Sequence, residues 1–289
     1  MDSRHKGVVC IIISAFFFAL MSLFVALAGD LPTMQKSFFR NAIAFLAAAF
    51  VLVRQRPHLN LASQGYRDLI LRSLFGTIGI LCNFYAVDHM LLADANILNK
   101  LAPFFAILMG ALILHEKIHP LQLSAVVGAF AGALLVIKPT NLVLALPAFV
   151  GVLGGLCAGI AYTMVRACGK QGIPGPFIVF FFSGFSCVVL VPFLIFNFCP
   201  MSMGQTMSLL AAGLSAAIAQ FAVTTAYTYA PARETAIFDY SQIIFAALFG
   251  FIAFGQVPDM LSWLGFGVIL ASALANFMFN NHQANRSAA

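Results

Sequence analysis

The sequence predicts an all-α membrane protein with ten transmembrane helices, arranged as two inverted five-helix repeats. Its composition is the first reason, because 62% of the 289 residues are hydrophobic, 8% are charged and the mean hydropathy is +0.99. Soluble domains carry about 25% charged residues, so a water-soluble globule is excluded. The second and third reasons are the regular spacing of long apolar segments and a constant internal offset between the two halves.

The first five predicted helices are apolar runs that begin and end at polar residues, Pro or Gly. They span residues 7–27, 33–53, 69–87, 92–114 and 121–137. The first run is longer than the roughly 7 to 15 apolar residues of a signal peptide, so we expect it to be retained as a helix.

The second five predicted helices span residues 147–167, 176–196, 207–229, 235–254 and 260–279. A helix needs about 20 residues to cross a bilayer, so ten helices use roughly 200 residues and leave only short connections. No soluble domain is expected.

The distribution of Lys and Arg predicts the orientation. With the N-terminus in the cytoplasm, eleven of the fifteen cations fall on the cytoplasmic side, namely Arg4, Lys6, Arg54, Arg56, Arg67, Arg72, Lys117, Arg166, Lys170, Arg233 and Arg286. The positive-inside rule then places both termini in the cytoplasm, in a multi-pass protein of the cytoplasmic (cell inner) membrane. The net charge of +6 is therefore interpreted as a topology signal, and no nucleic-acid partner is expected.

An offset of 140 residues relates the two halves of the chain. It aligns residues 103–110 with 243–250, including Ala106 with Ala246 and Gly110 with Gly250. We therefore expect repeat units 1–140 and 141–289. Because five helices is an odd number, the second unit enters the membrane from the opposite side, as in carriers that expose one midplane site to either face in turn. Duplication of a packing unit alone is the alternative.

Two stretches carry a family resemblance. Residues 102–116 run Ala-Pro-Phe-Phe-Ala through Gly110 to Glu116, and residues 38–41 run Phe-Phe-Arg-Asn. The chain resembles the EamA-type branch of the drug/metabolite transporter superfamily, which implies ten helices in two repeats and a transport function. That family moves amino acids, nucleotide-like metabolites, sugars, organic cations and drugs. The second repeat departs from the pattern with Ile243 at the usual Pro and Gln256 at the usual Glu, so the resemblance implies no particular cargo.

Three ionisable residues within the predicted helices are the primary site candidates. A charge near the bilayer centre costs about 2.5–3.5 kcal/mol, so each should face a cavity, a partner or an interface. We expect Arg40, Lys100 and Asp239 to line a transport cavity, where the cations receive a carboxylate or phosphate and Asp239 receives an amine or a proton. The alternatives are that Arg40 anchors its helix at the interface and that all three make structural hydrogen bonds. A Lys100–Asp239 ion pair is compatible with the repeat but is not required by it.

Other charges near helix ends have simpler interpretations. Lys36 is expected to be an interfacial anchor, and Asp88 and Asp94 are expected to be solvated charges that hold helix ends at the membrane surface. The alternatives are a cavity-lining Lys36 and a gating role for the two aspartates.

A larger set of polar and aromatic residues completes the predicted substrate-binding site. Gln220, Thr224 and Tyr227 recur at i, i+4 and i+7, so they share one helix face that should look at protein or water. The remaining candidates are Asn83, Tyr85, Asn96, Asn99, Tyr162, Tyr240 and Gln242.

The sequence lacks the residue sets that intramembrane catalysis would need. Every His lies at a helix end or in a connection, and neither an H-E-x-x-H pattern nor a phosphate-binding G-x(4)-G-K-[ST] loop occurs. The six Cys show no C-x-x-C spacing. We therefore expect no enzyme, no catalytic residue, no cofactor and no metal.

These observations favour a secondary transporter that moves a small metabolite, such as an amino acid or related organic solute, by alternating access. A zwitterionic or anionic cargo is expected because three of the embedded charges are cationic. The alternatives are an exporter of drugs or organic cations and a non-transporting membrane scaffold or receptor. The expected partners are a small-molecule solute and the lipid bilayer, while a coupling proton, a homodimer and the direction of transport stay open.

Overall fold

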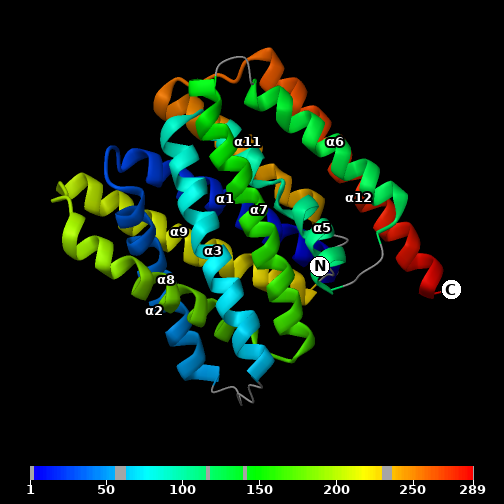
Figure 1. Cartoon of the computed structure of the whole chain (residues 1–289), viewed down its shortest axis with the longest axis horizontal. Coiled ribbons are helices and arrows are strands. Elements are labelled where there is room, and N and C mark those ends of the chain that lie inside the picture. The colour runs from blue at the N-terminus through cyan, green and yellow to red at the C-terminus, as the bar shows by residue number, and fades with distance from the viewer. Residues whose placement is uncertain (1–2, 56–62, 115–117, 139–141, 230–235, 289) are drawn as a thin grey trace.

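The computed structural model describes residues 3–55, 63–114, 118–138, 142–229 and 236–288 (Figure 1). Every regular element in these ranges is a helix, which confirms the predicted all-α class. Nine helices of the described part are long and apolar enough to cross a membrane, with α4 and α5 counted as one, and a tenth apolar helix, Phe238–Phe254, is shorter.

The helices follow the predicted order. The first half holds α1 (Ser3–Leu27), α2 (Thr33–Gln55), α3 (Ser63–His89), α4 (Leu92–Asn99), α5 (Ala102–Leu114) and α6 (Pro120–Ile137). The second half holds α7 (Leu142–Lys170), α8 (Gly175–Asn197), α9 (Met203–Tyr229), the 3₁₀ helix η1 (Ala236–Tyr240), α11 (Ser241–Phe254) and α12 (Met260–Ala288).

Two of the predicted continuous helices are irregular at equivalent points. The predicted helix 92–114 is interrupted between α4 and α5, where Leu101 N–H bonds back only three residues, to the Leu98 carbonyl. Pro103 explains the interruption, because it has no N–H to donate and its ring clashes with the carbonyl of residue 99. In the second half the chain changes from 3₁₀ to α geometry at Tyr240, which the 140-residue offset aligns with Lys100. No Pro occurs there, so the sequence gives no comparable signal.

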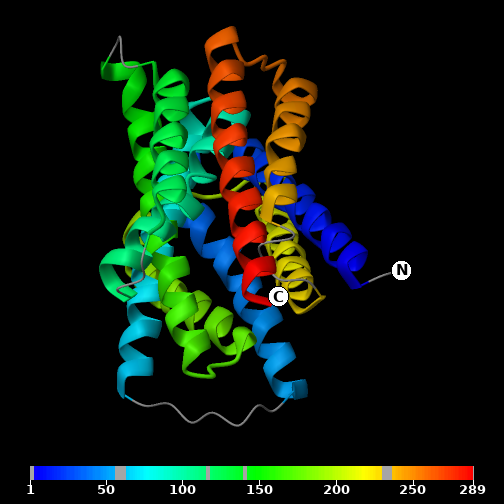
Figure 2. The same cartoon turned by 90° about the vertical axis from the view of Figure 1, so that its right-hand side faces the viewer.

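The main contacts between helices of the first half and helices of the second half recur between the equivalent helices. The helix α1 packs on α9 and α11, and its equivalent α7 packs on α3 and α5, which are the equivalents of α9 and α11. The helices α2 and α6 pack on their own equivalents, α8 and α12. The helices α1 and α7 run in opposite vertical senses (Figure 2). This arrangement agrees with two inverted repeats.

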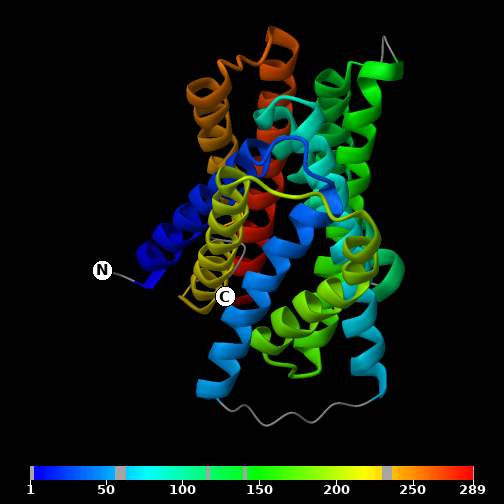
Figure 3. The same cartoon turned by 90° about the vertical axis from the view of Figure 1, so that its left-hand side faces the viewer.

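The bundle has two ends, which Figures 2 and 3 show from opposite sides. At the lower end α2 ends, α3 begins and α7 connects to α8. At the upper end α6 ends, α7 begins and α11 connects to α12. We call these the α2–α3 end and the α6–α7 end.

The helices α6 and α12 cross at a close glycine contact. A Cβ atom at Gly132 would lie 2.9 Å from the Gly265 carbonyl oxygen, and one at Gly265 would lie 2.7 Å from the Gly132 carbonyl oxygen. Gly267 and Ala271 of the same helix are exposed. The contacting face of α12 therefore runs through Gly265 and Ile269, and the exposed apolar residues around the bundle suit a lipid environment.

Candidate functional site

An ion pair joins the two halves where their helices are irregular. Lys100 Nζ, in the turn between α4 and α5, donates to Asp239 Oδ2 in η1. The side chains are only 11% and 25% exposed. The Tyr240 hydroxyl also donates to the Lys100 carbonyl at 3.2 Å. The Lys100–Asp239 ion pair, which the repeat allowed but did not require, therefore forms, and it joins equivalent points of the two repeats.

Asn96 is the centre of a second inter-repeat network. Its Oδ1 accepts from Gln242 Nε2 at 2.5 Å and from Ser22 Oγ at 3.2 Å, while its Nδ2 donates to the Leu92 carbonyl at 2.7 Å. The three side chains come from α4, α11 and α1. Because these buried amides are already satisfied, Asn96 and Gln242 hold the irregular helices together rather than presenting free groups to a solute.

Two arginines, Arg40 of α2 and Arg72 of α3, lie close enough to influence each other electrostatically. Arg40 is 7% exposed, and its Nη1 donates to Asn41 Oδ1 at 2.7 Å. The Arg72 guanidinium lies 4.0 Å above the centre of the Phe182 ring. The Nε atoms of both arginines are buried without a hydrogen-bond partner. Because it is buried, Arg40 does not extend to an interface as an anchor would.

The sequence pattern does not identify Arg72 as a site residue. Beginning its helix at residue 69 placed Arg72 among the cytoplasmic cations. The structure begins α3 at Ser63, which puts Arg72 about 14 Å along the helix axis at 1.5 Å per residue. A predicted helix that began at Ser63 instead of residue 69 would have placed Arg72 inside the membrane-spanning segment.

Tyr162 connects these charged groups. Its side chain is 56% exposed, although it interacts electrostatically with Arg40, Arg72 and Asp239, which belong to α2, α3 and η1. Tyr162 therefore lies near charged side chains of three other elements. We call Arg40, Arg72, Lys100, Tyr162 and Asp239 the central site.

The remaining predicted residues lie elsewhere or have other roles. Asn83 is buried in α3 with its Nδ2 unpartnered, and Tyr85 stacks on His89 with ring centroids 4.1 Å apart. Asn99 is half-buried. The side chains of Thr224 and Tyr227 lie outside the described residues, so the predicted polar face of α9 is represented only by Gln220.

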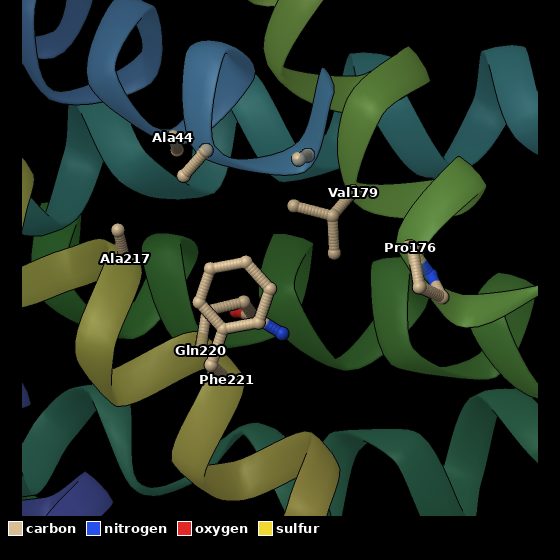
Figure 4. A pocket seen from close by; sticks show the side chains of 8 residues that line it. Ala44, Pro176, Val179, Ala217, Gln220 and Phe221 are labelled. Atoms are coloured by element: carbon tan, nitrogen blue, oxygen red, sulfur yellow. The ribbon is translucent and has the colours of Figure 1, made fainter. Parts of the chain in front are cut away.

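Gln220 lines a pocket between α2, α8 and α9 rather than the central site. Figure 4 shows its amide beside Phe221, opposite Ala44 and Val179. The other lining residues are Ala47, Ala48, Pro176 and Ala217, so this pocket is mainly apolar.

Polar contacts between the repeats close the α6–α7 end. Lys138 Nζ donates to Asp259 Oδ1 at 2.6 Å and to Ser262 Oγ at 3.0 Å. Gln35 and Cys199 exchange two hydrogen bonds of 3.0 Å. These contacts link the start of α2 and the end of α6 in the first repeat to the α8–α9 connection and to the start of α12 in the second.

Gln256 adds a helix cap to this closed end. Its Oε1 accepts from the Leu92 N–H at 3.0 Å, so it satisfies an otherwise free amide at the start of α4. An amide side chain can therefore do this at the position where the family has Glu.

Three expectations for charged residues at the α6–α7 end are wrong. Lys36 does not reach an interface, because it is fully buried and its Nζ lies 2.6 Å from Asp88 Oδ1. Asp88, expected to be solvated, pairs with Lys36, and its side chain is only 16% exposed. Asp94 is 5% exposed rather than solvated. Helix ends that pack against the other repeat exclude water from these positions.

The closing contact at Asp259 should be insensitive to pH near neutrality. The hydrogen bond from Lys138, followed by that from the Ser262 amide, lowers the pKa of Asp259 from 3.8 to about 2. A lowered carboxyl pKa stabilises the folded state above the ordinary value and loses this effect as pH falls toward about 2. We expect Asp259→Asn to lower the melting temperature by the same amount at pH 5 and pH 8. An effect that fades between these values would show that Asp259 titrates there.

The protein is a bundle of membrane-spanning helices in two structurally equivalent halves, and ionisable residues lie where two of its helices are irregular. These features define a membrane transport protein. Among the described residues no group of three or more His, Cys, Asp or Glu side chains is placed to hold a metal ion. The chain belongs to the EamA-like transporter family, whose model matches residues 5–138 and again residues 145–278.

Known relatives agree with this assignment. The pseudopaline exporter CntI of Pseudomonas aeruginosa PAO1 is 31% identical over 278 residues, which cover 95% of this chain and 97% of the exporter. A riboflavin transporter of Vibrio cholerae is 26% identical over 289 residues, with 94% of each chain covered. One solved crystal structure superposes with a TM-score of 0.65 over 94% of this chain and 97% of the other, and its 13% identity supports the fold alone.

Proposed function

We propose that this protein is a secondary transporter that moves a small organic solute, such as an amino acid or related metabolite, across the cytoplasmic membrane by alternating access. Its repeat units are residues 1–140 and 141–289, and both termini are cytoplasmic. The observation that carries the proposal is the Lys100–Asp239 pair, because it joins equivalent irregular points of the two repeats. Irregular helices at such points are where carriers bind their solutes.

The state of the two ends supports a carrier rather than a channel. Side-chain contacts between the repeats join the elements of the α6–α7 end, and Tyr162 of the central site is exposed. We infer from these two observations that solute reaches the site from the α2–α3 end, since alternating access requires a site to be open to one side at a time.

The charges of the central site favour an anionic or zwitterionic solute. Three cations and one carboxylate surround the site, so export of organic cations is the less favoured alternative. Pseudopaline and riboflavin, for which two relatives are named, support an organic solute in general terms. Asp239 is the residue that would carry a coupling proton. Neither a homodimer nor a scaffold function is needed to explain the site.

Solute counterflow into proteoliposomes tests the proposal. The purified protein would be reconstituted with a panel of radiolabelled amino acids, dicarboxylates, nucleosides and polyamines, with Asp239→Asn as the site variant and protein-free liposomes as the blank. We expect saturable flux of at least one solute, stimulated by the same solute on the other side and lost in Asp239→Asn. Flux that does not saturate would indicate a channel, and no flux of any solute would favour a scaffold.

A further inference from the structure

We propose that Arg40 and Arg72 form a binding site for an acidic group that carries two negative charges on the transported solute. This inference rests on the proposed function and deepens it, because it names the solute class: an organic dianion, with carboxylates or a phosphate as the charged groups. Arg72 is the new element, since its depth in α3 was not evident from the sequence.

The charge balance of the central site is the first argument. Lys100 and Asp239 neutralise each other, which leaves the two arginines as uncompensated cations. Among the described salt bridges, Asp68, one turn before Arg72 on α3, approaches Arg67 and also accepts from Gln171. Neither Arg40 nor Arg72 forms a salt bridge with a described acid. The site therefore carries two positive charges for a ligand to neutralise.

Unsatisfied donors are the second argument. More than nine tenths of the Arg40 surface is buried, and its Nε has no hydrogen-bond partner, as is also true of Arg72 Nε. A buried charged donor without a partner is costly, and the two guanidinium groups also repel each other. A dianion between them would satisfy both donors and remove the repulsion.

The two guanidinium groups are also held in place before any ligand binds. Phe182 covers one face of Arg72, and a Cβ atom at Gly76 would lie 2.1 Å from Arg72 Nη1 and 2.8 Å from the Phe182 ring. Asn41 fixes Arg40 from the neighbouring position. Planar guanidinium groups in fixed positions match the paired oxygens of carboxylates and phosphates.

A charge series of matched solutes tests the proposal on the purified full-length protein. Succinate, succinamate and succinamide have the same four-carbon skeleton and charges of −2, −1 and 0. Inorganic phosphate at pH 8 is the separate arm that distinguishes a phosphate preference from a dicarboxylate preference. We expect the melting temperature of the wild type to rise most with a dianion, less with succinamate and not with succinamide.

The arginine variants should remove this charge preference. In Arg40→Gln and Arg72→Gln, the concentration of dianion needed for half of the stabilisation should rise by about tenfold or more, since one charge-assisted contact is lost. Without any dianion, Arg72→Gln should melt no lower than the wild type, because removing one of two repelling cations relieves the empty site. An arginine with only a structural role would instead lower the melting temperature of the empty protein.

Two further variants keep the test decisive if a Gln variant folds poorly. Gly76→Ala keeps both charges but forces the Arg72 guanidinium from its place, so it should weaken dianion binding while sparing succinamate. Arg54→Gln is the matched control, because Arg54 is an exposed arginine of α2 that lies 5.1 Å above the Phe50 ring. It should bind dianions as the wild type does.

Two results would overturn the proposal. One is equal stabilisation of the wild type by both dianions and by succinamide, and the other is a dianion preference that survives in both Arg40→Gln and Arg72→Gln. Counterflow separates this failure from failure of the proposed function. Saturable counterflow without a dianion preference removes the arginine site alone, whereas a dianion preference without counterflow of any solute removes the transport function and leaves the site.

Discussion

Replacing Lys100 with methionine should abolish solute counterflow and clearly lower the melting temperature. Asp239 would keep its charge beside the buried hydroxyl and backbone of the helix irregularity but lose its partner. Breaking a buried pair costs about 3–5 kcal/mol, and we expect the lower part of that range because a quarter of the Asp239 side chain is exposed.

The double variant Lys100→Met/Asp239→Asn separates stability from transport. With both charges removed, no unpaired ion is left, so the melting temperature should return most of the way to the wild-type value. Counterflow should stay absent, because transport requires Lys100 and Asp239 to contact each other in one state and the solute in another. A double variant that transports normally would show that the pair is only structural. Thermal unfolding and counterflow of the same preparations measure both effects.

Adding a methyl group at Gly265 should have the second largest effect. The new Cβ would lie 2.7 Å from the Gly132 carbonyl oxygen and 2.7 Å from Val136 Cγ2, so α6 and α12 would have to separate. Overpacking of this kind typically costs about 1–3 kcal/mol. The obstructing oxygen belongs to the backbone, so a change of side-chain rotamer does not remove the clash.

Gly267→Ala is the matched control two residues further along α12. No atom lies within 4 Å of the Cβ position at Gly267, and alanine favours a helix by about 0.5–1 kcal/mol over glycine. We therefore expect Gly267→Ala to raise the melting temperature slightly while Gly265→Ala lowers it. Equal effects of the two substitutions in thermal unfolding would contradict the α6–α12 contact.

The helix order and the repeat could be predicted because both depend on patterns that are visible in the amino-acid sequence. Apolar run length fixes which segments can cross a bilayer, and the 140-residue offset indicates which of them are equivalent. The interruption near Lys100 was also within reach, since Pro103 in a helix frees the carbonyl four residues earlier. The 3₁₀ turn at Asp239 and Tyr240 was not, because no proline or glycine accompanies it.

Helix rotation and exact helix starts could not be predicted, and they account for most of the errors in the site. Arg72 was missed because its helix begins at Ser63. The sequence also does not indicate that the contacting face of α12 passes through Gly265 rather than Gly267. Periodicity in an apolar helix is weak because lipid and protein neighbours are both apolar, so only contacts with the other repeat decide which face is buried.

The most direct test of alternating access is the reactivity of a single cysteine at Tyr162, measured from each side of the membrane. The background would lack the six native cysteines, which are all free. We expect a membrane-impermeant maleimide to label Tyr162→Cys from the side of the α2–α3 end. Adding Asp259→Lys, which repels Lys138 and opens the α6–α7 end, should slow that labelling and make the cysteine reactive from the other side. Labelling that stays unchanged, or that becomes fast from both sides at once, would contradict alternating access.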